Sequence, residues 1–289
     1  MPPRKNARKN ALAGADAVGG RHLISNLPDG VLQHMLSFLP AQDAVRTCVL
    51  AKRWRHMWES TTVLRFVCGG MNEPKSIQDF VDQLLRLRIS GSTPLDTCEF
   101  RLGEIDEFNI DEDGIDVDGT SRINLWIRIA LQCKVRVLQF SCVVTATCEG
   151  GRVSICAPNL VSLWLEVCCG RTPSLQRMPY LLTAVVKILG YDYDRVPLHS
   201  DNDNNQSILL QGLSEVRNLV LLSHYTEMCV FRRDLKFCSS FNKLKSLLLN
   251  EYVLACLLKL SPVLEKLTLQ LNSKGPDRKV EIKLSCKPL

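Results

Sequence analysis

Cysteine is the residue type in this chain that first invites a search for chemistry, since 13 cysteines occur among its 289 residues. A zinc site or a redox pair commonly brings two cysteines together as Cys-x-x-Cys, and that spacing does not occur in the sequence. Most of the cysteines stand inside apolar runs, such as Cys48 in RTCVL and Cys142 in FSCVV. We therefore interpret them as small buried apolar side chains rather than as ligands.

The histidines and the acidic residues also lack the spacing of a metal site. The histidines are scattered along the chain, at His22, His34, His56, His199 and His224. Eight acids lie between residues 104 and 118, where Asn109, Asp111 and Asp113 match the first ligand positions of a calcium loop. The twelfth position holds Thr120, although such a loop needs a glutamate there. We interpret this segment as a solvated loop and expect no metal.

Nucleophilic and phosphate-binding motifs are equally lacking. No Ser, Cys or Thr stands in a recognisable catalytic signature, and no Gly-rich loop is followed by the Lys-Ser pair of a phosphate site. We predict no catalytic residue and no cofactor. The sequence therefore indicates a protein that acts by binding other molecules, so the question becomes which elements carry the binding surfaces.

The first such element is an apolar stretch between residues 23 and 60. Apolar residues recur at helical spacing from Val31 to Leu39, and Pro40 ends that helix because it disfavours helical geometry in the residue before it. A second short helix and a third one follow, and the third places Trp54 and Trp58 one turn apart. Three short helices cannot bury this much apolar surface among themselves. The stretch must either dock into a partner's groove or pack on the rest of the chain.

The same stretch resembles the F-box motif of plant F-box proteins. The resemblance rests on Leu27-Pro28-Asp29, the run Val31–Leu36, Leu39-Pro40, the segment Asp43–Leu50 and Lys52-Arg53-Trp54-Arg55 with Trp58. It implies docking to a Skp-family adaptor, which joins a cullin scaffold, while Trp54 and Trp58 pack the module together. Carried over by position, the residues that the resemblance assigns to the adaptor interface are Leu27, Pro28, Val31, Leu32, Leu36, Leu39, Pro40, Val45, Val49 and Leu50.

A leucine-patterned unit recurs in the remainder of the chain. Strand-like cores are predicted at 99–102, 136–140, 162–167, 184–189, 218–222, 245–249 and 266–271. Aligning Leu138, Leu163, Val186, Leu219, Leu247 and Leu267 gives steps of 25, 23, 33, 28 and 20 residues. Most of these steps fall in the range of leucine-rich repeats, whose units stack into a solenoid. This region resembles the irregular leucine-rich-repeat body of grass F-box proteins. Many such proteins continue into a further domain, so we expect a shortened chain or an incomplete array.

Alternation along two of these strands assigns a face that could bind a target. In residues 163–167 the odd positions are apolar and point inward, so Trp164 and Glu166 point outward. The pattern also allows Trp164 to lie in the core. In residues 267–271 the outward pair is Thr268 and Gln270. We take these four residues as the predicted target-binding surface, and the target itself is unknown.

The predicted architecture is an α/β chain in four parts: a disordered basic tail (1–21), an all-α three-helix F-box module (22–62), a connecting helical segment (63–94) and an irregular leucine-rich-repeat solenoid (95–289). The net charge is +6, of which +4 lies in the tail and only +2 in the body, which disfavours a nucleic-acid-binding body. No run approaches the roughly 18 apolar residues that a membrane span needs. We expect neither nucleic acid nor membrane as a partner, and a place in the cytoplasm, the nucleus or both.

The leading functional hypothesis is a non-catalytic, substrate-recognition subunit of an SCF-type ubiquitin ligase. An alternative is a leucine-rich-repeat scaffold whose F-box engages no ligase, since Gly30 weakens the first helix. A third hypothesis, a nucleic-acid-associated protein that uses the basic tail, predicts steeply salt-dependent binding.

Overall fold

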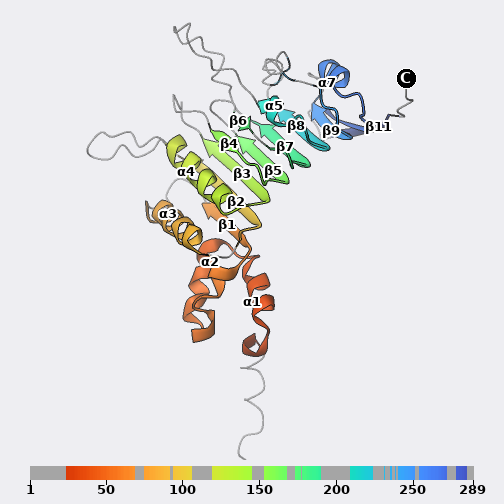
Figure 1. Ribbon diagram of the computed structural model, residues 1–289. Coiled ribbons are helices and arrows are strands. Elements are labelled where there is room, and N and C mark those ends of the chain that lie inside the picture. Colours follow the sequence, from red (N-terminus) through yellow and green to blue (C-terminus); the bar gives the residue numbers. More distant parts are fainter. Residues whose placement is uncertain are drawn as a thin grey trace, which may run out of the picture.

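The computed structural model describes fourteen stretches of the chain. They are residues 24–68, 75–91, 94–105, 119–144, 153–167, 173–176, 178–189, 209–223, 231, 235, 238, 240–250, 254–271 and 278–284. The basic tail and the acidic segment from Asp106 to Asp118 lie outside these residues, so their predicted structure is not tested. Figure 1 shows a helical module at one end and a long sheet with helices on one of its sides.

The N-terminal module, residues 24–60, consists of short helical segments. They are η1 (Ile24–Asn26), α1 (Asp29–Leu36), α2 (Ala41–Arg46), η2 (Thr47–Val49), η3 (Lys52–Trp54) and η4 (Met57–Ser60). Pro28 and Pro40 stand immediately before α1 and α2, where the missing proline N–H is no loss. The predicted third α-helix is wrong, because Ala51 is extended and the chain then forms two 3-10 turns. Those turns bury Trp54 and Trp58 as predicted.

The rest of the described chain is built on one nine-stranded sheet. Its strands are β1 (Val63–Cys68), β2 (Thr97–Ile105), β3 (Val137–Val144), β5 (Ser162–Val167), β7 (Thr183–Ile188), β8 (Asn218–Ser223), β9 (Ser246–Asn250), β10 (Lys266–Leu271) and β11 (Arg278–Lys283). They lie side by side in the order of the sequence. All neighbouring pairs are parallel except β10 and β11, which are antiparallel.

A second layer covers one face of this sheet. It contains α3 (Lys75–Ser90), α4 (Gly119–Gln132), β4 (Ser154–Cys156), β6 (Ser174–Gln176), α5 (Leu209–Gly212) and α7 (Leu254–Leu260). Within it, α3 contacts α4, α4 contacts β4, β4 pairs with β6 in parallel, and β6 contacts α5. The covering elements come from the connections between consecutive sheet strands from β1 to β8 and between β9 and β10, which is how parallel strands are normally joined.

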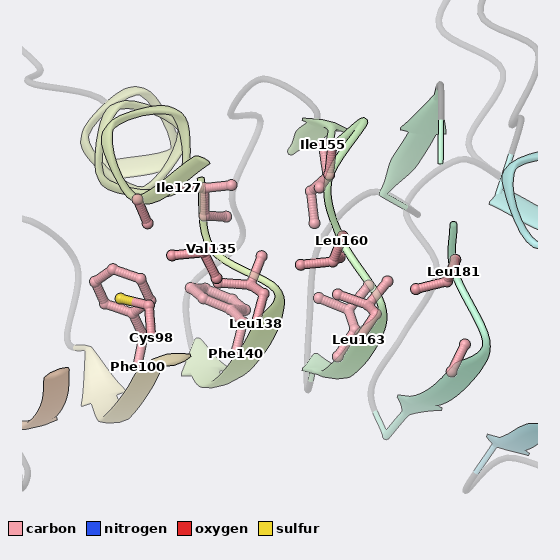
Figure 2. Close-up of a cluster of buried hydrophobic side chains, with 14 of the residues drawn as sticks. Cys98, Phe100, Ile127, Val135, Leu138, Phe140, Ile155, Leu160, Leu163 and Leu181 are labelled. Atoms are coloured by element: carbon pink, nitrogen blue, oxygen red, sulfur yellow. The ribbon is translucent and has the colours of Figure 1, made fainter. Parts of the chain in front are cut away.

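The core lies between the sheet and this layer. Alternate residues of each strand point into it, and register places equivalent residues such as Leu138 and Leu163 side by side. Figure 2 shows Leu138 and Phe140 on the side of α4 that carries Ile127, and Leu163 beneath Leu160 and Ile155. At the β1 end the core is aromatic, because the Phe100 ring stacks 5.1 Å from Phe66 and 6.1 Å from the ring of Trp126 in α4.

Two sequence predictions about the sheet need correction. The segment 63–94 is not a helical connection throughout, because it begins with β1, which pairs with β2 over six residues. The predicted alignment of the repeats is also wrong at one place, since Leu163 pairs with Ala184 rather than with Val186. The corresponding step is therefore 21 residues instead of 23, and the next, from Ala184 to Leu219, is 35 residues. The strands predicted at 162–167 and 266–271 have the observed bounds.

Candidate interaction surfaces

The N-terminal module exposes apolar side chains in a continuous stretch of sequence. Val49 is 82% exposed, Leu50 69% and Phe38 62%. Ile24, Val31, Met35 and Leu39 are also exposed large apolar side chains. So many exposed apolar side chains within a module of under forty residues are more than scattered single residues, and they favour a partner that covers them. We call these seven residues the apolar surface of the module.

The predicted adaptor-contact residues divide into three groups. Five are exposed: Pro28, Val31, Leu39, Val49 and Leu50. Leu27, Pro40 and Val45 are half-buried, and Leu27 and Val45 pack against the core. Leu32 and Leu36 are buried at 0% and 2% exposure. These two belong to the core of the chain itself and offer no surface to a partner in this structure.

Sequence reasoning missed two exposed apolar residues, Ile24 before the predicted set and Phe38 between two of its members. Phe38 follows the end of α1, so helical periodicity gave no signal for it, although its position before Leu39-Pro40 places it at the exposed turn between α1 and α2. Ile24 lies in η1, before the first predicted helix. Met35 was part of the apolar pattern but was not assigned to the interface, and it is exposed too.

An arginine fixes the start of α1 against the second half of the module. The Arg53 Nε donates to the Asp29 carboxylate at 2.9 Å, and its Nη2 donates to the Leu27 carbonyl at 2.6 Å. The Arg53 guanidinium also forms an ion pair with Asp29 through Nη2. Guanidinium groups hold carboxylates in a fixed geometry, so this contact positions α1 relative to η3. It orients the exposed residues of α1 without taking any of them out of solvent.

Two further arginines connect the module to the body. Arg65 on β1 donates from Nη1 to the Ser37 carbonyl at 2.8 Å and from Nε to the Glu99 carboxylate at 3.0 Å. Glu99 lies in β2, is buried, and is also paired with Arg101. The end of α1 is thus held against the first two strands of the sheet by a buried carboxylate and the arginines around it.

The second connection is Arg88 near the end of α3. Its guanidinium donates to the backbone carbonyls of Glu59 and Thr61, where the module ends and the sheet begins. Arg88 is only 4% exposed, and this burial lowers the pKa of its guanidinium. Module and body also share one continuous apolar core, so the apolar surface of the module is held in a fixed place relative to the sheet.

The second surface is the face of the sheet away from the covering layer, which we call the open face. Trp164 on β5 lies on it and is 37% exposed, so of the two arrangements that the sequence allows, the outward one is found. The Lys187 Nζ stands 4.7 Å from the centre of the Trp164 ring and 3.2 Å from the Glu166 carboxylate. Trp164, Glu166 and Lys187 therefore form one contact group, with a cation over the aromatic ring.

The other predicted pair on the open face is less accessible. Gln270 is half-buried, and Thr268 is 9% exposed although its strand alternation directs it to this face. Across the sheet, Thr268 stands between Leu248 on β9 and Glu281 on β11. The side chains of both neighbours are longer than that of Thr268, so they cover it. Thr268 is therefore a weak choice as a target contact, and Trp164 is the better one.

Other kinds of site are not found in the described part of the chain. There, no three His, Cys, Asp or Glu side chains come close enough together to hold a metal ion. None of the described helices has the length and apolar character needed to cross a membrane. Cys98 is a free thiol in the core, and this burial raises its pKa. A buried thiol of raised pKa is a structural rather than a reactive residue.

Comparison with known proteins agrees with the surface of the module. Residues 24–66 match the family model of the F-box domain. The chain is 28% identical over 218 residues to an F-box/LRR-repeat protein of Arabidopsis thaliana, covering 71% of this chain and 51% of that relative. It is 35% identical over 119 residues to an F-box protein of the same plant, covering 41% of this chain and 32% of the relative. The chain therefore contains an F-box domain at residues 24–66, and it is similar to plant F-box/LRR-repeat proteins, as the sequence resemblance indicated.

The similarity does not extend over whole relatives. A putative F-box/LRR-repeat protein of Arabidopsis thaliana is 58% identical over 43 residues, which is 15% of this chain and 9% of that relative. The chain spans about half of the length of the relative that it matches over the longest stretch, and less of the others.

Proposed function

We propose that this chain is the substrate-recognition subunit of an SCF-type ubiquitin ligase. A Skp-family adaptor covers the apolar surface of the module and links it to a cullin scaffold, while the body presents a target protein. The observation that carries the proposal is the exposure of Phe38, Val49 and Leu50 inside an F-box domain. Exposed apolar residues on short helices suit a partner that offers an apolar groove.

The proposal assigns no catalytic residue to this chain. The ubiquitin chemistry belongs to other subunits, and the contribution of this chain is to hold the target close to the ubiquitin donor. Such a role requires a fixed geometry between the two binding surfaces. Arg65 and Arg88 support this requirement, because each reaches from the body to backbone carbonyls of the module.

We further propose that the body is an irregular leucine-rich-repeat solenoid. Its support is the strand order, which follows the sequence, together with the parallel register that repeats an inward leucine at Leu138, Leu163, Leu219, Leu247 and Leu267. In such a solenoid each unit contacts only its neighbours, and the strands line one binding face. That face is the open face, which holds Trp164. We place the protein in the cytoplasm, the nucleus or both.

The test is co-purification of the full chain with a Skp-family adaptor. We expect the wild type to bind, and the double variant Val49→Asp, Leu50→Asp to lose at least 100-fold in affinity, since desolvated apolar anchors carry most of the energy of such interfaces. The matched control is Leu87→Asp, which alters a leucine on α3 that is 59% exposed but lies in the body. This variant should bind like the wild type.

Two outcomes would contradict the proposal. A folded wild type that does not bind the adaptor would favour a leucine-rich-repeat scaffold with a non-engaging F-box. Equal losses in the double variant and in Leu87→Asp would show that the adaptor does not recognise the apolar surface of the module. Circular dichroism of each variant separates a lost interface from a lost fold.

A further inference from the structure

The open face carries a row of apolar side chains in the middle of the sheet. Register places Val185, Val220 and Leu248 side by side on β7, β8 and β9, in the same row as Trp164 on β5. The three aliphatic side chains are half-buried, and no described helix covers them. With strands about 4.8 Å apart, the four residues span about 14 Å, which accommodates one or two bulky side chains of a partner.

The charges on this face are arranged unevenly. Two acids with described side chains on this face are neutralised by neighbours there, since Glu166 is paired with Lys187 at 3.2 Å and Glu281 with Lys266 at 3.0 Å. The charge of Glu99 is neutralised too, because Glu99 is paired with two arginines. At the far edge, Lys279 and Lys283 on β11 are exposed, and among the described residues no acid lies within ion-pair distance of either.

We propose that the segment recognised by the open face is an extended acidic peptide with a bulky apolar side chain. The apolar side chain lies over Val220 and Leu248, in the row that begins with Trp164, and the carboxylates meet Lys279 and Lys283. This inference rests on the proposed function, in which a target protein docks on this face. It adds the chemistry of the target, which the face selects by an apolar centre and an uncompensated basic edge.

The structure also gives the spacing between the two features of the peptide. From β9, which carries Leu248, to β11 is two strand spacings, or about 10 Å. An extended chain advances about 3.3 Å per residue, so the acids should follow or precede the apolar residue by about three positions. A peptide with adjacent apolar and acidic residues, or with the two far apart, does not satisfy both contacts at once.

The proposal is tested with fluorescein-labelled ten-residue peptides and the full chain, by fluorescence polarisation. The probe has one Phe and, three residues away, two Glu in a Ser-Gly background. One comparison peptide replaces the Glu pair by Lys, another replaces Phe by Ala, and a third places the Glu pair next to Phe. We expect the probe to bind at least tenfold more tightly than each comparison peptide. Raising the salt concentration from 50 to 200 mM should weaken its binding.

Variants locate the binding on the open face. Lys279→Glu combined with Lys283→Glu should lower the affinity for the probe at least fivefold, as should Leu248→Ala, which removes most of the side chain under the Phe of the probe. The matched control combines Arg128→Glu on α4 with Lys259→Glu on α7, which makes the same charge change on exposed residues of the covering layer. This control should bind the probe like the wild type. Neither set touches the apolar surface of the module, so adaptor binding should stay unchanged in all of them.

The outcomes separate this inference from the function on which it rests. Equal affinity for the Glu and Lys peptides, or an unchanged affinity in the Lys279, Lys283 variant, overturns the inference while adaptor binding can still be intact. Tighter binding of a ten-nucleotide poly-dT to the same lysines overturns it in favour of a nucleic acid. If the probe behaves as expected but the adaptor does not bind, the chemistry of the face stands and the ligase role does not.

Discussion

The module and the body contain similar apolar residues but distribute them differently between core and surface. In the module, Val49 and Leu50 are mostly exposed although they stand next to each other in a short helical segment. In the body, Leu138, Leu163 and Leu219 occupy one register row and are at most 1% exposed. A parallel sheet with a covering layer can bury every second residue of each strand, whereas a few short helices have too little interior to do so.

This difference in the exposure of apolar residues indicates where partners bind. The body buries the inward apolar residues of its central strands, and the middle of its open face carries a narrow row of half-buried aliphatic side chains. The module leaves whole side chains in solvent, which one partner can cover together. We therefore expect the module to provide most of the energy for a constant partner, and the open face to provide selection between targets.

The largest expected effect tests whether the module has a core of its own beside its surface. Leu36→Asp places a carboxylate at a position that is 2% exposed, and should destabilise the chain by more than about 4 kcal/mol. Leu50→Asp changes an exposed residue and should alter the free energy of unfolding by no more than about 0.5 kcal/mol. Urea unfolding followed by tryptophan fluorescence measures both. Similar losses in the two variants would remove the distinction between core and surface leucines in the module.

The second prediction concerns the connection between the two regions. Arg88→Met removes the donors to the Glu59 and Thr61 carbonyls, and leaving buried carbonyls without a donor should destabilise the chain by about 1–3 kcal/mol. The loss is limited because the variant also removes a desolvated charge. Arg86→Met, on the exposed side of the same helix, is the control and should change stability by about 0.5 kcal/mol or less.

Hydrogen exchange shows where the Arg88 effect acts. We expect faster exchange of the backbone amides around Trp58 and Thr61 in Arg88→Met, because the chain there loses its anchor to α3. The amides of β7 and β8, far along the sheet, should exchange as in the wild type. Uniformly faster exchange over the whole sheet would instead show that Arg88 supports the body as a whole and does not act at the junction.

How much of this could be predicted from the sequence depends on the local pattern. The strand at residues 162–167 was predicted with its bounds because a strict alternation of apolar and other residues has no helical alternative. The segment TAVVKI allowed the register error at Ala184, because Ala184, Val185 and Val186 are all apolar and the smallest of them is the core residue in line with Leu163. The strand β1 was missed because it lies before the first unit of the predicted repeat, so no repeated pattern marked it as a strand.

The candidate site was predicted in part for a similar reason. Periodicity along α1 identifies one broad apolar face, and Leu32 and Leu36 lie on the same side of it as Val31 and Met35 in a helical projection. Which part of that face is covered by the rest of the module depends on the 3-10 turns that carry Trp54 and Trp58, and their placement is a tertiary property. The basic edge at Lys279 and Lys283 likewise depends on the antiparallel pairing of β11, which local sequence does not specify.

Gly212 in the body and Gly30 in the module differ in how closely their surroundings pack around them. A Cβ added at Gly212 in α5 would lie 2.7 Å from the Leu175 carbonyl carbon, whereas one added at Gly30 in α1 would meet nothing within 4 Å. Gly212→Ala should therefore destabilise the chain by about 1–3 kcal/mol through overpacking. Gly30→Ala should stabilise it by up to about 1 kcal/mol, because alanine favours a helix over glycine. Thermal unfolding measures both, and a loss of stability in Gly30→Ala would contradict the open packing of the module.

The smallest expected effect is the pH dependence of stability that the buried thiol of Cys98 gives to the core of the body. Burial raises the pKa of this thiol above its ordinary value, so the folded chain keeps the proton at a pH where the unfolded chain releases it. The stabilising contribution is complete below a pH of about 8.5, the ordinary pKa of a thiol, and is lost progressively as the pH rises above it. The free energy of unfolding should therefore fall by about 1 kcal/mol more in the wild type than in Cys98→Ala between pH 8 and pH 9.5.

Urea unfolding at several pH values measures this difference, and Cys256→Ala, which alters an exposed cysteine, serves as the control. The control should show the same pH dependence as the wild type, because it keeps the buried Cys98. A parallel assay with an aromatic disulfide reagent should modify Cys156 and Cys256 in the folded protein and Cys98 only after unfolding. Rapid modification of Cys98 without unfolding would show that the core of the body opens locally. The core of the body would then be less fully closed to solvent than the comparison with the module assumes.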